Sequence, residues 1–247
     1  MYKWILPFLF IINHAYAFTV DSMFKVDSEN SRYFTLKNPD DEPVYLAVSL
    51  SELQRAGKGR YQESALSPDD FLTWPLYIDP MDIVIDAKGE LRVSVIRTAQ
   101  ITPHDRIIGV SFIPDSLRQQ EQGEKSNVAI AIGYKSWYLI PGSQRITGEP
   151  QAWLSNRKIH FSNPTNKVLR LILDVCPAKE KQAGSDACYS EAILLPGNDK
   201  QIPVPDAADL ERGKVTFLTL LSSIKKRSPC ARPDKEITHR LSDSSLR

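Results

Sequence analysis

The sequence predicts an all-β protein built from two antiparallel β-sandwiches. Short runs of β-branched and aromatic residues recur along its 247 residues, turn signals separate them, and few stretches have helical periodicity. Its 17 prolines, against 11 glycines, suit turns and edge strands and argue against long helices. A hydrophobic content of 42% allows real cores. The chain length fits two domains of roughly 100–120 residues each.

The expected strands fall into two sets on either side of Pro141-Gly142-Ser143, which we interpret as the hinge. The first set is Arg32–Lys37, Val44–Ser49, Asp82–Ile85, Leu91–Ile96, Ile107–Phe112 and a last strand within Asn127–Ile140. The second set is Lys158–Ser162, Val168–Val175, Tyr189–Leu195, Lys200–Val204 and Val215–Leu221. Proline-containing turns at Asn38-Pro39 and Asn163-Pro164 follow early strands of each set. The predicted domains are therefore 18–141 and 142–224, with one possible helical turn at Ser116–Glu121.

The first 17 residues are typical of an export signal. Lys3 precedes an apolar run at 4–12, and Ala15-Tyr16-Ala17 has the form of a signal-peptidase site, which would make Phe18 the first mature residue. The alternative is a membrane anchor, but about 20 apolar residues are needed to span a bilayer, and this run is about half as long. We therefore expect an exported protein. The last segment, 225–247, has seven basic against three acidic residues and is expected to be a solvated tail.

Three cysteines remain: Cys176, Cys188 and Cys230. In an oxidising compartment Cys176 and Cys188 would pair across a short loop, which the chain-entropy model values at about 3 kcal/mol. Pairings of either one with Cys230 stay open. A metal site is disfavoured because no CxxC or Cys/His spacing is present.

Motifs of catalysis are absent from the sequence. It has no GxSxG, HExxH, GxxxxGK[ST] or GxGxxG, so neither an ATP site nor another cofactor site is expected. A hydrolase would need His104 or His160 near a serine. The pairs Asp40-Asp41 and Asp69-Asp70 each follow a proline and are interpreted as turn residues. A net charge of +1 gives no reason to expect a nucleic-acid partner.

The segment Asn127–Tyr134 has the most distinctive pattern in the chain. Val128, Ile130, Ile132 and Tyr134 alternate with alanine and glycine, so a strand would place all four large side chains on one face. A polar run, 119–126, precedes it. At a sheet edge such a strand could pair with a partner's strand. The alternative is an ordinary strand of the core.

Several motifs recur across both predicted domains: Arg32–Asn38, Asp79–Ile85 with Arg92–Val95, Pro103-His104-Asp105-Arg106, Phe161–Thr165 and Leu194–Gly197. Together they resemble motifs of the periplasmic pilus chaperones, the PapD-like family of the chaperone–usher pathway. Ile107 stands where the family has a glutamate. The spacing of Cys176 and Cys188 looks closest to the alternative-type branch.

The resemblance implies two immunoglobulin-like domains in an L or boomerang shape and a non-enzymatic role in fimbrium biogenesis. Such a chaperone would hold pilus subunits in the periplasm by donor-strand complementation and deliver them to an outer-membrane usher. The residues that would bind the subunit are Val128, Ile130, Ile132 and Tyr134. In the absence of subunit, self-association could cover the apolar edge.

The family also holds the subunit's C-terminal carboxylate with two basic residues in the interdomain cleft. Lys135 lies on the opposite side of its strand from Ile132, as the family's lysine does, although its spacing differs. The family's arginine position aligns near Phe24, which leaves Lys25 beside it as the candidate. A different hypothesis is that the chain is itself a structural or adhesive β-sandwich protein of the cell surface.

Overall fold

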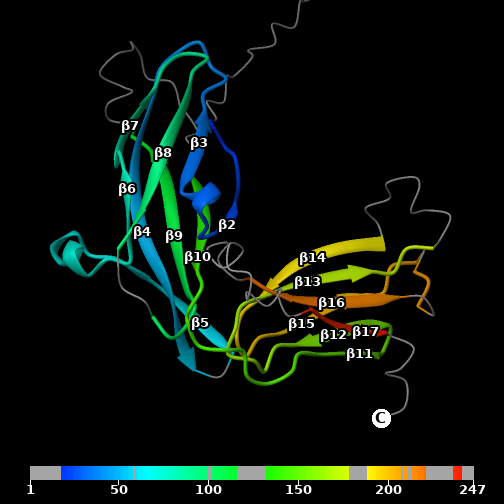
Figure 1. The fold of residues 1–247 in the computed structure, drawn as a ribbon. Helices are drawn as coiled ribbons and strands as arrows, with labels where there is room; N and C mark the ends of the chain where they lie inside the picture. The colour runs from blue at the N-terminus through cyan, green and yellow to red at the C-terminus, as the bar shows by residue number, and fades with distance from the viewer. Residues whose placement is uncertain are drawn as a thin grey trace, which may run out of the picture.

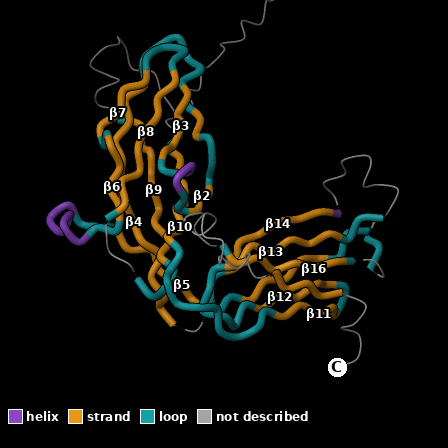
Figure 2. The backbone as a smooth tube through the Cα atoms, in the orientation of Figure 1, coloured by secondary structure: helices purple, strands orange, loops and turns teal. Residues whose placement is uncertain are grey.

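The computed structural model describes residues 18–57, 59–98, 102–115, 132–177, 188–206, 208–210, 213–220 and 236–240. These residues form two β-sandwiches that meet at an angle and give the molecule the shape of an L (Figure 1). The predicted all-β, two-sandwich fold is therefore confirmed. Short helical turns are confined to the first domain and the start of β14 (Figure 2).

The first domain contains ten of the described strands and two short 3-10 helices. They are β1 (Thr19–Val20), β2 (Phe24–Val26), η1 (Glu29–Ser31), β3 (Tyr33–Lys37), β4 (Val44–Gly57), β5 (Arg60–Ala65), η2 (Pro68–Thr73), β6 (Leu76–Asp79), β7 (Asp82–Ile85), β8 (Glu90–Arg97), β9 (Arg106–Pro114) and β10 (Tyr134–Ile140). One sheet has the order β1-β3-β8-β6, and the other has the order β2-β10-β9-β4-β5, with β7 also paired to β4.

Alternation of side chains explains how these strands form a sandwich. Along β8, Val93 and Val95 are buried while Arg92, Ser94 and Ile96 point to solvent. Strands with this pattern bury one face and leave the other wet. The core between the two sheets includes large buried rings from three strands. They are Phe34, Phe112 and Tyr138.

The first described segment crosses from one sheet to the other. Strand β1 pairs antiparallel with β3, while β2 pairs parallel with β10 in the opposite sheet. Between them, Asp21 still bonds to Thr35 of β3, whereas the carbonyl of Met23 accepts from the Trp137 amide of β10. The crossing therefore takes place at residues 21–23.

The second domain pairs a three-stranded sheet with a four-stranded one. Its strands are β11 (Gln151–Ser155), β12 (Lys158–Ser162), β13 (Leu169–Asp174), β14 (Tyr189–Leu194), β15 (Asp199–Pro203), β16 (Lys214–Thr219) and β17 (Glu236–Arg240). The orders are β11-β12-β15 and β14-β13-β16-β17. Phe161, Leu171 and Phe217 lie in the core between them.

Strand β17 differs from the expectation for the chain's last segment. We expected 225–247 to be a solvated tail, yet Glu236–Arg240 pair antiparallel with β16, with residue 237 opposite Phe217. The edge of β16 accounts for this, because its open backbone groups gain hydrogen bonds from a returning strand. Within the described ranges, no helix has the length and apolar character needed to cross a membrane.

The two domains meet through a third, smaller apolar cluster. Ile107, Leu139 and Val168 are its buried members. Partly buried apolar residues from both domains pack around them: Phe24, Val26, Leu53, Trp137, Ile193, Leu195 and Leu220. Ile107, the residue that departs from the family's glutamate, thus lies at the apolar junction.

Candidate functional site: the free edge of β10 and the interdomain junction

The N-terminal half of β10 has a free edge. Its inner neighbour, β9, pairs with it along its whole length, from Tyr134 opposite Phe112 to Ile140 opposite Arg106. Its outer neighbour, β2, pairs only with Trp137, Tyr138 and Leu139, because the first segment has crossed to the other sheet before that point. Among the described residues, no strand pairs with the outer edge of β10 before Trp137, that is, along residues 134–136.

Two of the four predicted donor residues, Ile132 and Tyr134, are described by the structure. Val128 and Ile130 fall outside the described residues, as does the predicted turn at 116–121. Ile132 is described and is 41% exposed. Gly133 lies close beside the end of β9, since a Cβ at this residue would be 3.0 Å from the Phe112 carbonyl oxygen. The described chain thus approaches β10 alongside the last residues of β9.

Tyr134 is the last of the four alternating large residues and is the first residue of β10, in the first sandwich. Its ring is partly buried against the first core and meets Phe18 edge-on, with 5.0 Å between the ring centroids. Ser136, Tyr138 and Ile140 are buried on the same side of β10. Tyr134 therefore belongs in part to the protein's own core, while Ile132, two residues earlier, is exposed.

Lys25 lies on the opposite face of β2 from Phe24 and Val26. Its ammonium donates to Asp21 Oδ2 at 2.7 Å and to the carbonyl of Tyr33 at 2.6 Å. It also lies 4.8 Å from the centroid of the Phe34 ring. The structure thus directs this lysine toward β3, away from the junction cluster that contains Phe24 and Val26.

Lys135 lies on the outer face of its sheet, as the alternation predicted. Its ammonium forms an ion pair with Glu63 of β5 and lies 5.6 Å from the centroid of the Trp137 ring. The hydrogen bond from Lys135 lowers the pKa of Glu63 below its ordinary value. The pair is therefore ionised and electrically neutral as a unit at physiological pH.

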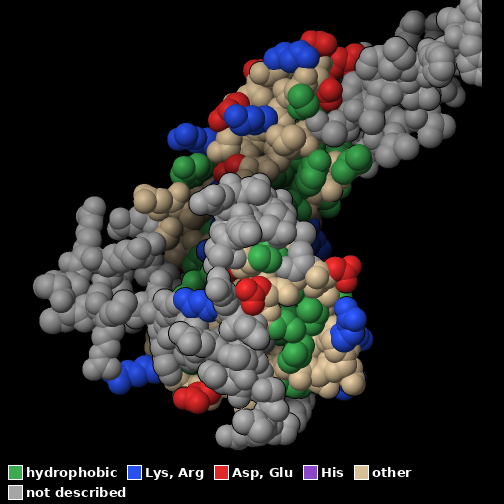
Figure 3. All heavy atoms as spheres, turned by 90° about the vertical axis from the view of Figure 1, so that its right-hand side faces the viewer, with side chains coloured by type: hydrophobic (Ala, Val, Ile, Leu, Met, Phe, Trp, Pro, Cys, Tyr) green, Lys and Arg blue, Asp and Glu red, His purple; other side chains and the backbone are tan. Residues whose placement is uncertain are grey.

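Trp137 and Phe24 form an aromatic floor on the same outer face. They are directly opposite in the parallel pairing of β10 and β2, so their side chains share one face. Gly109 of β9 lets the indole approach the sheet closely, because a Cβ there would be 3.0 Å from Trp137 Cζ3. Both rings pack on the junction cluster. Figure 3 looks onto this open side of the L and shows hydrophobic and charged side chains on both domains.

A buried ion pair fixes the junction below this floor. Asp105 accepts from Lys167 Nζ of the second domain at 2.8 Å and from the Val168 amide at 2.8 Å. The amide of Gly142, in the linker, also donates to Asp105 at 2.8 Å. On the far side of the junction, Tyr61 donates to the carbonyl of Pro196 at 3.0 Å. Two separate polar contacts therefore hold the domains at their angle.

A second buried carboxylate anchors the lower half of β10. Asp27 is fully buried and accepts from Arg97 at 2.7 Å and from the Tyr138 hydroxyl at 2.9 Å. Its backbone amide donates to the carbonyl of Leu139. These bonds fix the segment after β2 to β10 at the point where the paired region ends.

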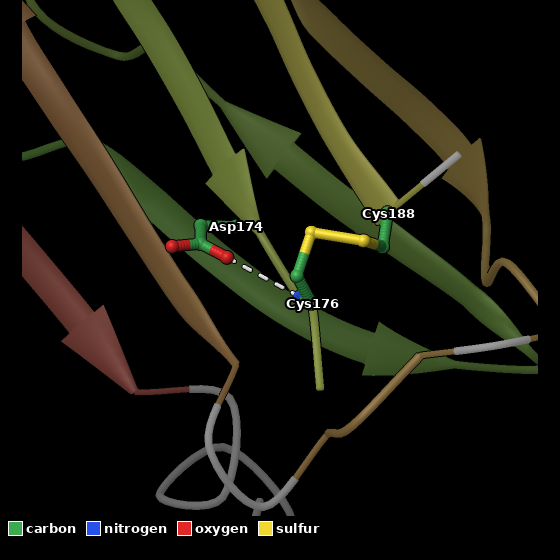
Figure 4. Close-up of a disulfide and its surroundings, with 3 residues drawn as sticks. All are labelled: Asp174, Cys176 and Cys188. Carbon is green, nitrogen blue, oxygen red and sulfur yellow. Dashed lines mark hydrogen bonds between the residues drawn. A yellow bond between two sulfur atoms is a disulfide. The ribbon is translucent and has the colours of Figure 1, made fainter. Parts of the chain in front are cut away.

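The predicted Cys176–Cys188 disulfide is confirmed, and it lies in the second domain (Figure 4). The two Cα atoms are 4.8 Å apart, at the ends of β13 and β14. The Val175 amide bonds to the Cys188 carbonyl, and Asp174 Oδ1 accepts from the Cys176 amide at 3.2 Å. The bridge thus closes the end of a strand pair and lies in the sandwich away from β10.

Possible catalytic residues do not gather in the described part of the chain. His160 stacks on Trp153 with ring centroids 5.2 Å apart and has an unpartnered Nε2. No described serine hydroxyl bonds to His104 or His160. The described residues also hold no group of three His, Cys, Asp or Glu side chains that could bind a metal.

Comparison with known proteins finds a family model that matches the first domain and a related protein of Escherichia coli. Residues 20–141 match the family model of the CS5 fimbrial protein N-terminal domain. An Escherichia coli protein described as an uncharacterized 25.9 kDa protein in the CS5 3' region is 28% identical over 204 residues, which are 82% of this chain and 88% of that protein.

Solved structures share the two-domain fold at low sequence identity. A chain of the Salmonella enterica complex of the SafA pilin with the SafB chaperone is 12% identical, with a TM-score of 0.51 over 93% of this chain and 98% of that chain. The class 5 fimbriae chaperone CfaA is 13% identical, with a TM-score of 0.49 over 90% of this chain and 98% of that chain. The fold argument rests on the first of these. At the level of the fold, the resemblance inferred from the sequence motifs is confirmed.

Proposed function

We propose that this two-domain β-sandwich protein, whose first domain matches the CS5 fimbrial family, is a chaperone of fimbrial subunits. It would bind a subunit by donating strand residues and deliver it to an outer-membrane usher. The free edge of β10 is the observation that carries this proposal. An incoming strand can pair with residues 134–136 at the start of β10, end to end with β2, without displacing any described strand.

The donated side chains would come from the alternating series that leads into β10. Val128, Ile130 and Ile132 are assigned to pockets of the subunit, at about 1.5–3 kcal/mol for each side chain fully buried, before the costs of association. Tyr134 packs on Phe18, so we assign it chiefly to holding the base of the donor strand. Main-chain hydrogen bonds would supply affinity, and the alternating side chains would supply specificity.

The route of delivery follows from this mode of binding. The subunit can leave the chaperone when another subunit's strand replaces the donated one, so the cycle needs neither ATP nor a catalytic residue. The hydrophobic N-terminal run and the Cys176–Cys188 bridge suit an oxidising, exported compartment, which here is the periplasm. In the absence of subunit, a second copy of the chain could cover the same edge.

Co-expression tests the proposal. The chain is produced together with candidate fimbrial subunits and an usher, and the periplasm and the fibres are analysed separately. A chaperone forms a soluble one-to-one complex with the subunit and is absent from the fibres. Recovery of this chain within the fibres would instead support a structural or adhesive surface protein.

A further inference from the structure

We infer that the end of the bound subunit strand is held by an apolar contact on Phe24 and Trp137, rather than by basic residues. This inference rests on the proposed function. It concerns the short stretch of the outer sheet face where the free edge of β10 meets the first residue of β2, and it assigns that stretch to an uncharged, apolar side chain of the subunit.

The pairing of β10 determines where an added strand must end. Strand β2 begins at Phe24, opposite Trp137, and occupies the edge from there to Leu139. The Ser136 hydroxyl also bonds to the carbonyl of Ser22. A strand added along the start of β10, as far as Ser136, therefore meets β2 end to end. Its last side chain on the outer face lies beside Phe24 and Trp137.

The aromatic floor at this point keeps accessible area. Phe24 and Trp137 are partly buried, unlike Leu139, which is the next residue on that face of β10 and is fully buried in the junction. The indole packs closely against Gly109. A rigid aromatic surface with free area, beside the end of a binding edge, is suited to contact with an apolar side chain.

The basic residues that the structure describes near this floor already have partners. Lys135 is paired with Glu63, and Lys25 bonds to Asp21 and Tyr33 on the other face of β2. Arg106 forms two bonds to Glu52, at 2.6 and 2.7 Å. Arg55, in β4, donates from Nε to the carbonyl of Gly57 at 3.3 Å. A carboxylate would gain Lys135 only by displacing Glu63, an exchange of one ion pair for another.

The inference is tested by measuring how tightly purified variants of the full chain bind the fimbrial subunit that forms a complex with it on co-expression. Trp137→Leu should weaken binding by roughly tenfold, and Trp137→Phe should restore most of the affinity. Lys135→Met, which keeps the aliphatic stem and removes the charge, should change the affinity by about twofold at most. Extension of the subunit by three residues at its C-terminus, which moves the carboxylate, should be equally mild.

The opposite pattern would overturn the inference. A tenfold loss in Lys135→Met or in the extended subunit, or wild-type affinity in Trp137→Leu, would mean that charge and not the aromatic floor holds the strand end. Ile130→Asp is the separate control for the proposed function, since it removes a donated side chain and leaves the floor intact. If Ile130→Asp binds the subunit normally, strand donation itself is wrong. Thermal melting of each free variant verifies that the junction still folds.

Discussion

Asp105 and Lys167 form an ion pair that joins the two domains, with Nζ and Oδ1 2.8 Å apart and side chains only 3% and 5% exposed. Asp105 also accepts hydrogen bonds from the amides of Gly142 and Val168. One carboxylate of the first domain therefore binds both the linker and the residue before β13. Such a pair specifies geometry more than it adds net stability, because both charges lose their hydration. It fixes the angle at which the second domain stands beside β10.

Loss of one partner of this pair should be costly. Lys167→Met leaves the Asp105 carboxylate buried with two amide donors, and we expect the free energy of unfolding to fall by about 3–5 kcal/mol. The double variant Asp105→Asn/Lys167→Met should lose less than the sum of the two single variants, since no buried charge is left without a partner. Urea unfolding measures the coupling. X-ray scattering should show a wider range of interdomain angles in Lys167→Met, and additive losses would contradict the assigned pairing.

Much of the fold could be predicted because its strands alternate clearly. The expected runs Arg32–Lys37, Asp82–Ile85 and Ile107–Phe112 became β3, β7 and β9. Buried side chains alternate with exposed ones in β7, whereas β3 and β9 are mostly buried. Strand β5, RYQESA, could not be recognised, since it is almost entirely polar and is held by its pairing with β4. Strand β17 was not predicted, because the segment 225–247 was interpreted from its excess of basic residues alone.

The site could be predicted in part. Alternation in 128–134 indicates a donor strand, but a sequence carries no sign that the first segment leaves one sheet and joins the other, which is what frees the β10 edge. The two lysines were chosen from their parity and neighbours. Partners distant in sequence, Glu63 for Lys135 and Tyr33 for Lys25, determine where their ammonium groups lie. Trp137 was missed because its importance depends on register with Phe24.

Substitution of a donated residue should abolish subunit binding without unfolding the chaperone. Ile130→Asp would place a charge in an apolar subunit pocket, so we expect no recoverable chaperone–subunit complex after co-expression. The matched control is Ile96→Asp, an exposed isoleucine (49%) on the other sheet, which should give wild-type yield. Circular dichroism of both free variants should match the parent. Equal yields from Ile130→Asp and the parent would rule out strand donation.

Two asparagines have equivalent structural roles at the ends of early strands in the two domains. Asn163 donates to the carbonyls of Lys167 and Leu194, at 2.9 and 3.0 Å, and Asn38 likewise donates to Ile85 and Asp86. Asn163→Asp turns the donating amide into an acceptor that faces two carbonyls, and should cost about 3 kcal/mol. Asn156→Asp, at an exposed position of the turn between β11 and β12, should cost under about 1 kcal/mol. Similar melting temperatures for the two variants would contradict this role.

Removal of the disulfide should weaken the second domain and spare subunit binding. Cys176 and Cys188 are 12 residues apart, and the chain-entropy model gives their bridge about 3 kcal/mol. The variant Cys176→Ser/Cys188→Ser should therefore unfold at lower urea concentration, while its complex with subunit forms at low temperature as in the parent. Reduction of the parent with dithiothreitol should reproduce the shift. If the double variant is folded but binds no subunit, the second domain has a direct part in binding.

Alkaline pH should destabilise the first domain through Tyr138. Burial, and then the charge of Asp27, raises the pKa of Tyr138 well above its ordinary value of 10.0. The folded state thus holds this proton more tightly than the unfolded state. Its contribution is fully present below about pH 10 and is lost as pH rises toward the folded pKa, at up to about 1.4 kcal/mol per pH unit.

Tyr138→Phe should remove that part of the alkaline loss. At neutral pH the variant gives up one hydrogen bond to Asp27, which keeps Arg97 at 2.7 Å, so we expect it to be less stable by about 1–2 kcal/mol. Above about pH 10 its stability should fall less steeply than that of the parent, and the two curves should converge. Tyr77→Phe is the control in the same domain, because its hydroxyl forms an exposed hydrogen bond to the carbonyl of Phe71 at 2.9 Å. Urea unfolding at a series of pH values measures both slopes, and parallel curves for parent and Tyr138→Phe would show that this tyrosine does not set the alkaline limit.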